Sequence, residues 1–192
     1  MQRTILLAMS LFAFTQVGGC GDDSDDGGGG GGGGGGSESA TLTYPNGHPL
    51  NWISSDPTTL TNEDQVLTLT NNHRVSLMPP APALVHDLLM RQAARGHSRH
   101  MRGDIHDFFA HLNPENDQPW DRLTKNGVVW TSAGENIAAG YPDATSVFNA
   151  WLASPGHRAN IENAGYGRIG VGYSPGGGGS GYSTYWTQKF AN

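Results

Sequence analysis

Three ionisable side chains in the second half of the chain occupy positions that suit shared chemistry. Glu135 lies in a Gly-Glu-Asn sequence, and His157 directly follows a Pro-Gly pair. His111 follows two phenylalanines that we expect in the core, and it precedes a Leu-Asn-Pro turn. A carboxylate and two imidazoles are groups that proteins use to bind zinc and to transfer protons. The pattern predicts a shared pocket formed by these three residues.

A predicted helix between Glu135 and His157 is the element that would position both side chains. Asp143 is a favourable N-cap for this helix. One apolar face follows at helical spacing, made of Ala144, Val147, Phe148 and Trp151. The Pro155-Gly156 pair ends the helix. We therefore expect Glu135 and His157 at the two ends of one rigid helix.

Two interpretations of the pocket remain open from the residues alone. In the first, His111 and His157 bind zinc, and Glu135 is a third ligand, orients a histidine or acts as a general base. In the second, Glu135 and Asn136 tie a loop to buried backbone amides, and the histidines belong to a structural polar network. Ser154 lies near His157 but lacks an evident oxyanion-stabilising device, so we do not predict a serine nucleophile.

The first 39 residues predict an anchor and a tether. Residues 1–19 have the pattern of a signal peptide, whose apolar stretch is shorter than the roughly 20 residues that a membrane-spanning helix needs. Cys20, the only cysteine, stands where bacterial lipoproteins carry the lipidated residue. The alternative is an ordinary secretory signal with an incidental cysteine. Residues 20–39 then form an acidic and glycine-rich flexible tether.

Composition excludes some classes of function and sets the expected location. The formal net charge of −6 argues against a sequence-independent nucleic-acid surface. A single cysteine cannot form an intrachain disulfide. We expect a monomer outside the cytoplasm, held at a bacterial membrane by the lipid on Cys20, with the outer membrane or the cell surface as the favoured site.

The remaining sequence predicts an irregular segment over residues 40–61 and one folded domain over residues 62–192. A first helix is expected from Thr61 or Asn62 to the Pro79-Pro80 pair. A second is expected from Pro82 to about Met101, with Val85, Leu88, Leu89, Ala93 and Gly96 on its apolar face. His97 and His100 share one face of this helix without a local carboxylate, which favours a structural or surface role over metal binding.

Shorter elements follow towards the C-terminus. Pro119 to Asn126 predicts a short helix, and Val128 to Trp130 predicts a short strand. Ile169 to Tyr173 and Tyr182 to Phe190 predict two strands of an antiparallel hairpin. Glycine alternates with larger residues in the first of these strands, which indicates that another element packs closely against it.

Four ordered motifs resemble the bacterial branch of the CAP superfamily, whose unit is also called the SCP-like domain. The motifs read GENIA, AWLASPGHRANI, IGVGY and YWTQKFA, and the resemblance extends from Val66 to Phe190. The superfamily is named for cysteine-rich secretory proteins, antigen 5 and plant pathogenesis-related proteins. The resemblance implies an α/β fold, an α-β-α sandwich with a small, mainly antiparallel central sheet and about four helices.

The resemblance also implies a central cavity lined by two histidines and two glutamates. His111, Glu135 and His157 match three of these positions. Ser154 occupies the place of the second glutamate, so the set of four is incomplete in this chain. We expect a ligand pocket lined by His111, Glu135, Asn136, Ser154 and His157.

We expect from these features a membrane-tethered domain that binds a small ligand, a lipid, a metal or a partner protein at the cell envelope. The alternative is a metal-dependent hydrolase of the peptidase type that uses His111, Glu135 and His157, with zinc as its cofactor and Glu135 as the candidate catalytic residue. A third interpretation is a purely structural surface module. Enzymatic activity is the less favoured of the first two.

Overall fold

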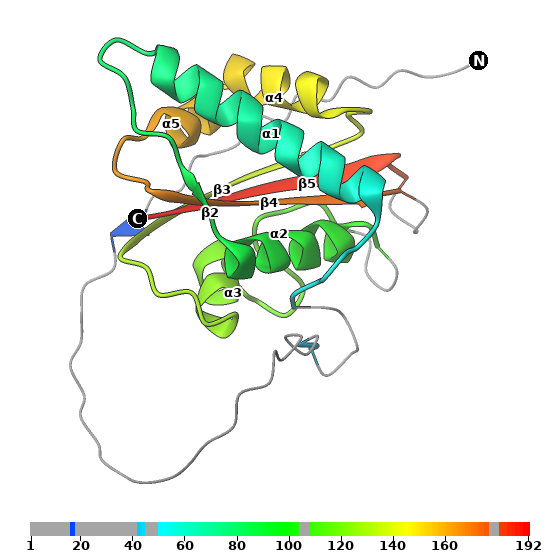
Figure 1. Cartoon of the computed structure of the whole chain (residues 1–192). Coiled ribbons are helices and arrows are strands. Elements are labelled where there is room, and N and C mark those ends of the chain that lie inside the picture. Colours follow the sequence, from blue (N-terminus) through cyan, green and yellow to red (C-terminus); the bar gives the residue numbers. More distant parts are fainter. Residues whose placement is uncertain (1–15, 18–41, 45–49, 104–107, 177–180) are drawn as a thin grey trace, which may run out of the picture.

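A computed structural model describes residues 16–17, 42–44, 50–103, 108–176 and 181–192. Cys20, nearly all of the predicted signal peptide and all of the predicted tether lie outside the described residues. The described chain folds into three layers, with helices on both faces of a central sheet (Figure 1). The predicted α-β-α sandwich is therefore confirmed.

The central sheet has the strand order β1-β3-β5-β4-β2. Its three long strands are antiparallel neighbours, and they are β3 (Ser132–Ala139), β5 (Thr184–Ala191) and β4 (Arg168–Pro175). The short strand β2 (Val85–His86) pairs with β4 in parallel. The two-residue strand β1 (Gln16–Val17) pairs with β3. The predicted antiparallel pairing of the last two long strands is confirmed, and the sheet as a whole is mixed.

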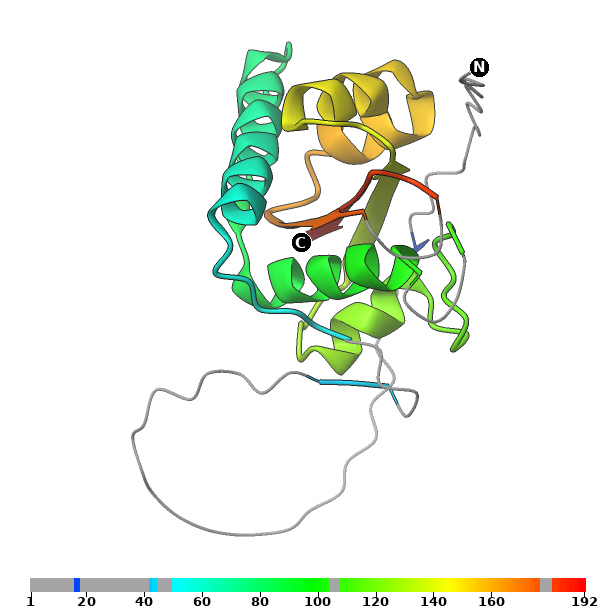
Figure 2. The same ribbon diagram turned by 90° about the vertical axis from the view of Figure 1, so that its right-hand side faces the viewer.

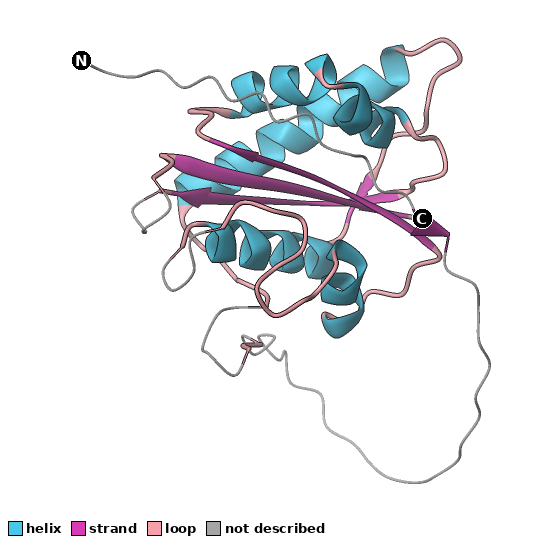
Figure 3. Ribbon diagram, turned by 180° about the vertical axis from the view of Figure 1, so that it is seen from behind, coloured by secondary structure: helices cyan, strands magenta, loops and turns pink. Residues whose placement is uncertain are grey.

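Within the described residues, five helices cover the two faces of the sheet. On one face lie α1 (Pro57–Ser76), α4 (Ala144–Ala153) and α5 (Pro155–Glu162), and on the other lie α2 (Leu88–Met101) and α3 (Pro119–Lys125) (Figure 2). Every residue of β5 is buried, because both of its faces are covered. The view from behind shows the same three layers with the sheet between the helices (Figure 3).

The first helix begins earlier than the sequence indicated. The Asp56-Pro57 pair, which suggests a turn, is the start of α1. The Asp56 carboxylate accepts a hydrogen bond from the backbone N–H of Thr59 at 2.8 Å, and Pro57 occupies the first helical position. Proline is favoured there because it lacks a backbone N–H, and an N–H at this position would have no acceptor inside the helix.

The second helix begins later than predicted, at Leu88. Strand β2 lies where its first turns were expected, and Asp87 caps the helix by accepting a hydrogen bond from the N–H of Met90. Val85 and Leu88 were expected in the apolar face but are each 66% exposed. The buried face is formed further along the helix, where side chains pack against β4 and β5.

The predicted strand at Val128 to Trp130 is wrong, since no strand is assigned to these residues. The strand begins at Ser132 and runs through the Gly-Glu-Asn sequence. The predicted helix after Asp143 is confirmed with its cap and its buried face. Pro155 not only follows this helix but begins α5.

Close packing between α2 and β4 follows from two glycines. A Cβ atom on Gly170 would lie 2.2 Å from the carbonyl carbon of Met90, and one on Gly172 would lie 2.2 Å from that of Ala94. Such distances are far inside van der Waals contact, so only glycine lets the helix backbone approach this strand. The close packing that the alternating glycines predicted is thus confirmed.

Candidate functional site

Glu135 lies in the middle of β3 with its side chain on the face covered by α2 and α3. Its Cα is paired with that of Lys189 in β5. The next residue, Asn136, points to the opposite face, towards α5, because side chains alternate along a strand. Glu135 and His157 therefore do not lie at the two ends of one helix, as the sequence suggested. One belongs to a central strand and the other to α5.

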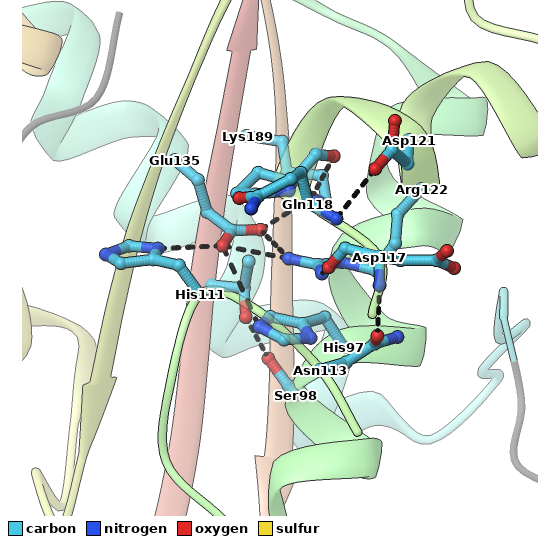
Figure 4. Close-up of polar contacts among 12 residues, drawn as sticks. His97, Ser98, His111, Asn113, Asp117, Gln118, Asp121, Arg122, Glu135 and Lys189 are labelled. Carbon is cyan, nitrogen blue, oxygen red and sulfur yellow. Dashed lines mark hydrogen bonds and ion pairs between the residues drawn. The ribbon is translucent and has the colours of Figure 1, made fainter. Parts of the chain in front are cut away.

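Two buried cations hold the Glu135 carboxylate, which is 1% exposed. Arg122 donates from Nη2 to both carboxylate oxygens, at 3.0 and 2.9 Å, and Lys189 donates from Nζ to Oε2 at 2.6 Å. Figure 4 shows Arg122 on one side of the carboxylate and His111 on the other. We call Glu135, Arg122 and Lys189 the charge cluster.

Electrostatics within the charge cluster keep Glu135 ionised. Burial acts to raise the pKa of Glu135, but the positive charges of Arg122 and Lys189 outweigh it and hold that pKa well below its usual range. Burial lowers the pKa of Lys189 to about 8, against the opposing effect of Glu135. At neutral pH the cluster therefore contains one carboxylate between two cations.

His111 contacts the charge cluster through one ring nitrogen. Its Nδ1 lies 2.9 Å from Glu135 Oε1. Because this carboxylate is ionised, Nδ1 must carry the proton, and in the neutral ring Nε2 is left as an acceptor. Within the described part of the chain, this buried Nε2 has no hydrogen-bond partner. The arrangement therefore presents an oriented lone pair.

His157 lies close enough to His111 for their charges to interact. Burial, and then the proximity of His111, lower the pKa of His157 to about 4, so its ring is neutral at neutral pH. Its position depends on Asn136, whose amide donates to the His157 carbonyl at 3.1 Å, and on Asn160, whose amide donates to the Glu135 carbonyl at 3.3 Å. These two asparagines join α5 to β3.

Asn136 and Ser154, the other predicted pocket residues, have structural contacts. Asn136 is fully buried, and its amide also donates to Gln188 Oε1 at 3.0 Å. It therefore connects β3, β5 and α5. Ser154 is half-buried at the junction of α4 and α5, where its backbone N–H donates to the carbonyl of Trp151.

Three residues of this region were missed from the sequence as site residues. Arg122 and Lys189 form the charge cluster, and His97 of α2 lies with its Nε2 3.7 Å from Glu135 Oε1. His97 is 1% exposed, so a surface role is wrong for it. One signal in the sequence could have indicated an internal ion pair. Lys189 is a charged residue inside a strand whose other residues are also buried.

The residues present do not fit a zinc centre with three protein ligands. Both oxygens of Glu135 already accept hydrogen bonds from cationic groups, and Arg122 and Lys189 would repel a divalent cation. The described residues contain no group of three His, Cys, Asp or Glu side chains that could hold a metal ion. For the same reason Glu135 is a poor general base, because its pKa lies far below neutral pH. Of the predicted site residues within the described chain, His111 and His157 remain as the groups with functional chemistry.

A search of the described residues finds no helix with the length and apolar character needed to span a membrane.

Comparison with known proteins places the chain in a family. The model of the cysteine-rich secretory protein family, CAP, matches residues 67–190. Two proteins of Bacillus subtilis are similar to this chain. The first, the uncharacterized protein YkwD, is 36% identical over 67% of this chain and 46% of its own length. The uncharacterized membrane protein YlbC is 35% identical over 68% of this chain and 34% of its own length. The chain thus spans less than half of these relatives.

A solved structure agrees with this assignment. An extracellular protein of Bacillus anthracis that contains an SCP domain is 31% identical, with a TM-score of 0.62 over 73% of this chain and 44% of that one. The sequence motifs, the three-layer sandwich and the matched region all correspond, and the chain belongs to the CAP family of cysteine-rich secretory proteins.

Proposed function

We propose that this chain is a membrane-tethered CAP domain outside the cytoplasm, which binds a small ligand through His111 and His157. The observation that carries the proposal is the buried lone pair of His111 Nε2, which has no partner in the described chain. A buried acceptor without a hydrogen bond is unfavourable, so a ligand that donates an O–H or N–H group would be stabilised there. The neutral ring of His157 offers a second polar contact nearby.

The charge cluster supports binding over hydrolysis. Arg122 and Lys189 fix the Glu135 carboxylate, and this carboxylate in turn fixes the ring of His111. Such an arrangement orients an imidazole for recognition but leaves no base with a pKa near neutral pH at Glu135. Glu135 is therefore a positioning residue in this proposal.

The tether belongs to the same proposal. The signal pattern of residues 1–19 and Cys20 support attachment to a membrane from outside the cytoplasm. The extracellular protein of Bacillus anthracis and the membrane protein YlbC, to which this chain is similar, support that location. Replacing Cys20 with serine should move the protein from the membrane fraction to the soluble fraction. Equal amounts in the membrane fraction for both forms would contradict lipid anchoring.

Native mass spectrometry tests the binding site even though the ligand is unidentified. The protein, purified from its own cell envelope in mild detergent, should carry an additional bound mass. A His111→Ala/His157→Ala variant should lose that mass while keeping its circular dichroism spectrum. His73→Ala is the matched control, because this histidine lies on α1 and pairs with Glu162. Retention of the bound mass in the double variant, or no bound mass in any preparation, would refute the proposal.

A zinc titration by calorimetry separates this proposal from the metal-dependent hydrolase. Mature protein with Cys20→Ser should show no heat of binding at micromolar zinc, because the described residues place only His111 and His157 as available ligands at this site. Tight binding that disappears in the double histidine variant would restore the hydrolase interpretation. Peptide hydrolysis that is lost in Glu135→Gln with the fold intact would do the same.

A further inference from the structure

The chain that precedes α1 forms a strap on the layer of helices that covers the side chain of Glu135. The strap consists of residues 42–44 and 50–52, and Figure 2 shows the part just before α1, in cyan, passing along α2. The Trp52 N–H donates to the carbonyl of Gln92 in α2 at 3.0 Å. A Cβ atom on Gly96 would lie 2.4 Å from a carbonyl oxygen of the strap, so this close approach needs glycine.

Two hydrogen bonds hold the parts of the strap together. The Leu42 N–H donates to Asn51 Oδ1, and the Leu50 N–H donates to the Leu42 carbonyl, each at 2.7 Å. The Asn126 amide, directly after α3, also donates to the Leu50 carbonyl, at 3.4 Å. These contacts tie Tyr44, two residues after Leu42, to the folded domain.

Tyr44 connects the strap to the loop that carries His111. Its hydroxyl donates to Asp117 Oδ2 at 2.6 Å and accepts from Asn113 Nδ2 at 2.8 Å, and both hydrogen bonds are buried. Asn113 lies two residues after His111. The hydroxyl of Tyr44 is therefore bound to the same loop as the imidazole that we assign to ligand binding.

Asn113 and Asp117 close this loop. The Asn113 Oδ1 atom accepts from the Asp117 N–H at 2.7 Å, and the Asn113 N–H donates to the Asp117 carbonyl at 3.2 Å (Figure 4). Arg122 donates from Nη1 to the same carbonyl at 2.7 Å, while its Nη2 donates to Glu135. Polar contacts thus run without a break from Tyr44 through the charge cluster to His111.

The hydrogen bond between Tyr44 and Asp117 joins a neutral hydroxyl to a carboxylate. Burial acts to raise the pKa of Asp117, but hydrogen bonds from Lys125 and Tyr44 outweigh it and lower that pKa. Lys125 Nζ lies 2.6 Å from Asp117 Oδ1. Burial, and then Asp117, raise the pKa of Tyr44, so its hydroxyl keeps the proton that it donates. Such charge-assisted hydrogen bonds are stronger than neutral ones.

We infer that the strap is a positioning element of the ligand site and that Tyr44 is a positioning residue for His111. The inference rests on the proposed function, because it concerns the same imidazole. Glu135 fixes the ring of His111 at Nδ1, and the Tyr44 hydroxyl fixes the backbone of the loop from the other side. A binding side chain keeps its direction only if the groups behind it are held in place. A domain that began at residue 62 would lack this support.

Tyr44→Phe tests the inference because it removes the hydroxyl and keeps the ring. Nuclear magnetic resonance on mature protein carrying Cys20→Ser needs no ligand. The parent protein should show His111 as one tautomer, protonated at Nδ1. In Tyr44→Phe the ring nitrogen signals of His111 should move towards those of a ring that averages both tautomers. The amide hydrogens of Asn113 and Asp117 should exchange about tenfold faster or more, since two buried hydrogen bonds are lost, one of them to a charged group.

Tyr173→Phe is the matched control for this substitution. Tyr173 is 9% exposed and Tyr44 is 8% exposed, but Tyr173 packs on Trp186 in the core on the other face of the sheet. This control should leave the His111 ring signals unchanged. Amide exchange in β5 reports on the whole fold, so exchange that is faster in the loop than in β5 supports positioning.

Three results would overturn the inference. They are His111 ring signals in Tyr44→Phe that match the parent, equal changes of those signals in Tyr173→Phe, and exchange that is accelerated by the same factor in β5 and in the loop. Failure of the proposed function is a different result. A missing bound mass in native mass spectrometry refutes ligand binding, whereas unchanged His111 signals refute the positioning role of Tyr44.

Discussion

Replacing Glu135 with glutamine should destabilise the fold by about 3–5 kcal/mol, the usual cost of leaving a buried charge without its partner. Glutamine keeps the shape of the side chain but removes its charge. Arg122 and Lys189, whose side chains are 2% and 0% exposed, would then face each other without the carboxylate that lies 2.9 and 2.6 Å from them. Since a typical domain has about 5–15 kcal/mol of total stability, this loss is large.

Urea unfolding followed by tryptophan fluorescence measures the loss in the free energy of unfolding. Thermal unfolding is a second measurement. For a domain of this size each kcal/mol lost lowers the thermal midpoint by about 2–4 °C, so this midpoint should fall by about 6–20 °C. Glu162→Gln is the control, because Glu162 pairs with His73 and the side chains of Glu162 and His73 are 33% and 24% exposed. That change should cost no more than about 1 kcal/mol.

A second substitution separates the lost charge from a packing defect. In Glu135→Gln/Lys189→Met one of the two unpaired cations is also absent, so part of the lost stability should return. A double-mutant cycle with Lys189→Met alone gives the coupling energy. The reasoning would be refuted by a loss below about 1 kcal/mol in Glu135→Gln, or by a double variant as unstable as the sum of its two single changes.

Three further predictions follow from local contacts. The pKa of His157 is lowered to about 4, so the folded state binds fewer protons than the unfolded state. The free energy of unfolding should therefore decrease as the pH is lowered from about 6.5 to about 4. Urea unfolding across this range should show a weaker decrease in His157→Gln, and identical profiles in the two proteins would contradict the prediction. Gly172→Ala places a Cβ 2.2 Å from the Ala94 carbonyl carbon and should lower the free energy of unfolding by about 1–3 kcal/mol or more. Thermal unfolding measures this loss, and Gly167→Ala is the control because a Cβ there meets no atom within 4 Å. Asp143→Ala removes the hydrogen bond to the N–H of Ser146 and should cost about 0.5–2 kcal/mol in urea unfolding, whereas no change would show that the cap is dispensable.

The sequence predicted best those elements that depend on neighbouring residues. The helix after Asp143 was correct in its cap, its buried face and its end, because a capping side chain and an apolar stripe act within a few residues. The same kind of signal misled at Asp56-Pro57, where a pair that is typical of turns is also suited to the start of a helix.

Buried strands were harder to predict. Strand β3 has six consecutive buried residues, so it lacks the alternation of polar and apolar side chains that marks a half-exposed strand. Its Gly-Glu-Asn sequence resembles a loop, and Val129 just before it, which was expected in a strand, is 84% exposed. Long-range pairing, mainly with β5, makes this segment a strand.

The amino-acid sequence by itself determined the family, the class of fold, the helix after Asp143 and the antiparallel pairing of the last two long strands, because these follow from local pattern and ordered motifs. Only the tertiary structure decided the chemistry of Glu135. Its ionisation comes from Arg122 and Lys189, which lie 13 and 54 positions away along the chain, and its oxygens accept hydrogen bonds from these two residues and from His111. Charges separated so far in sequence act on one another only after the sheet and α3 have brought them together in a dry interior, where electrostatic interactions are strongest.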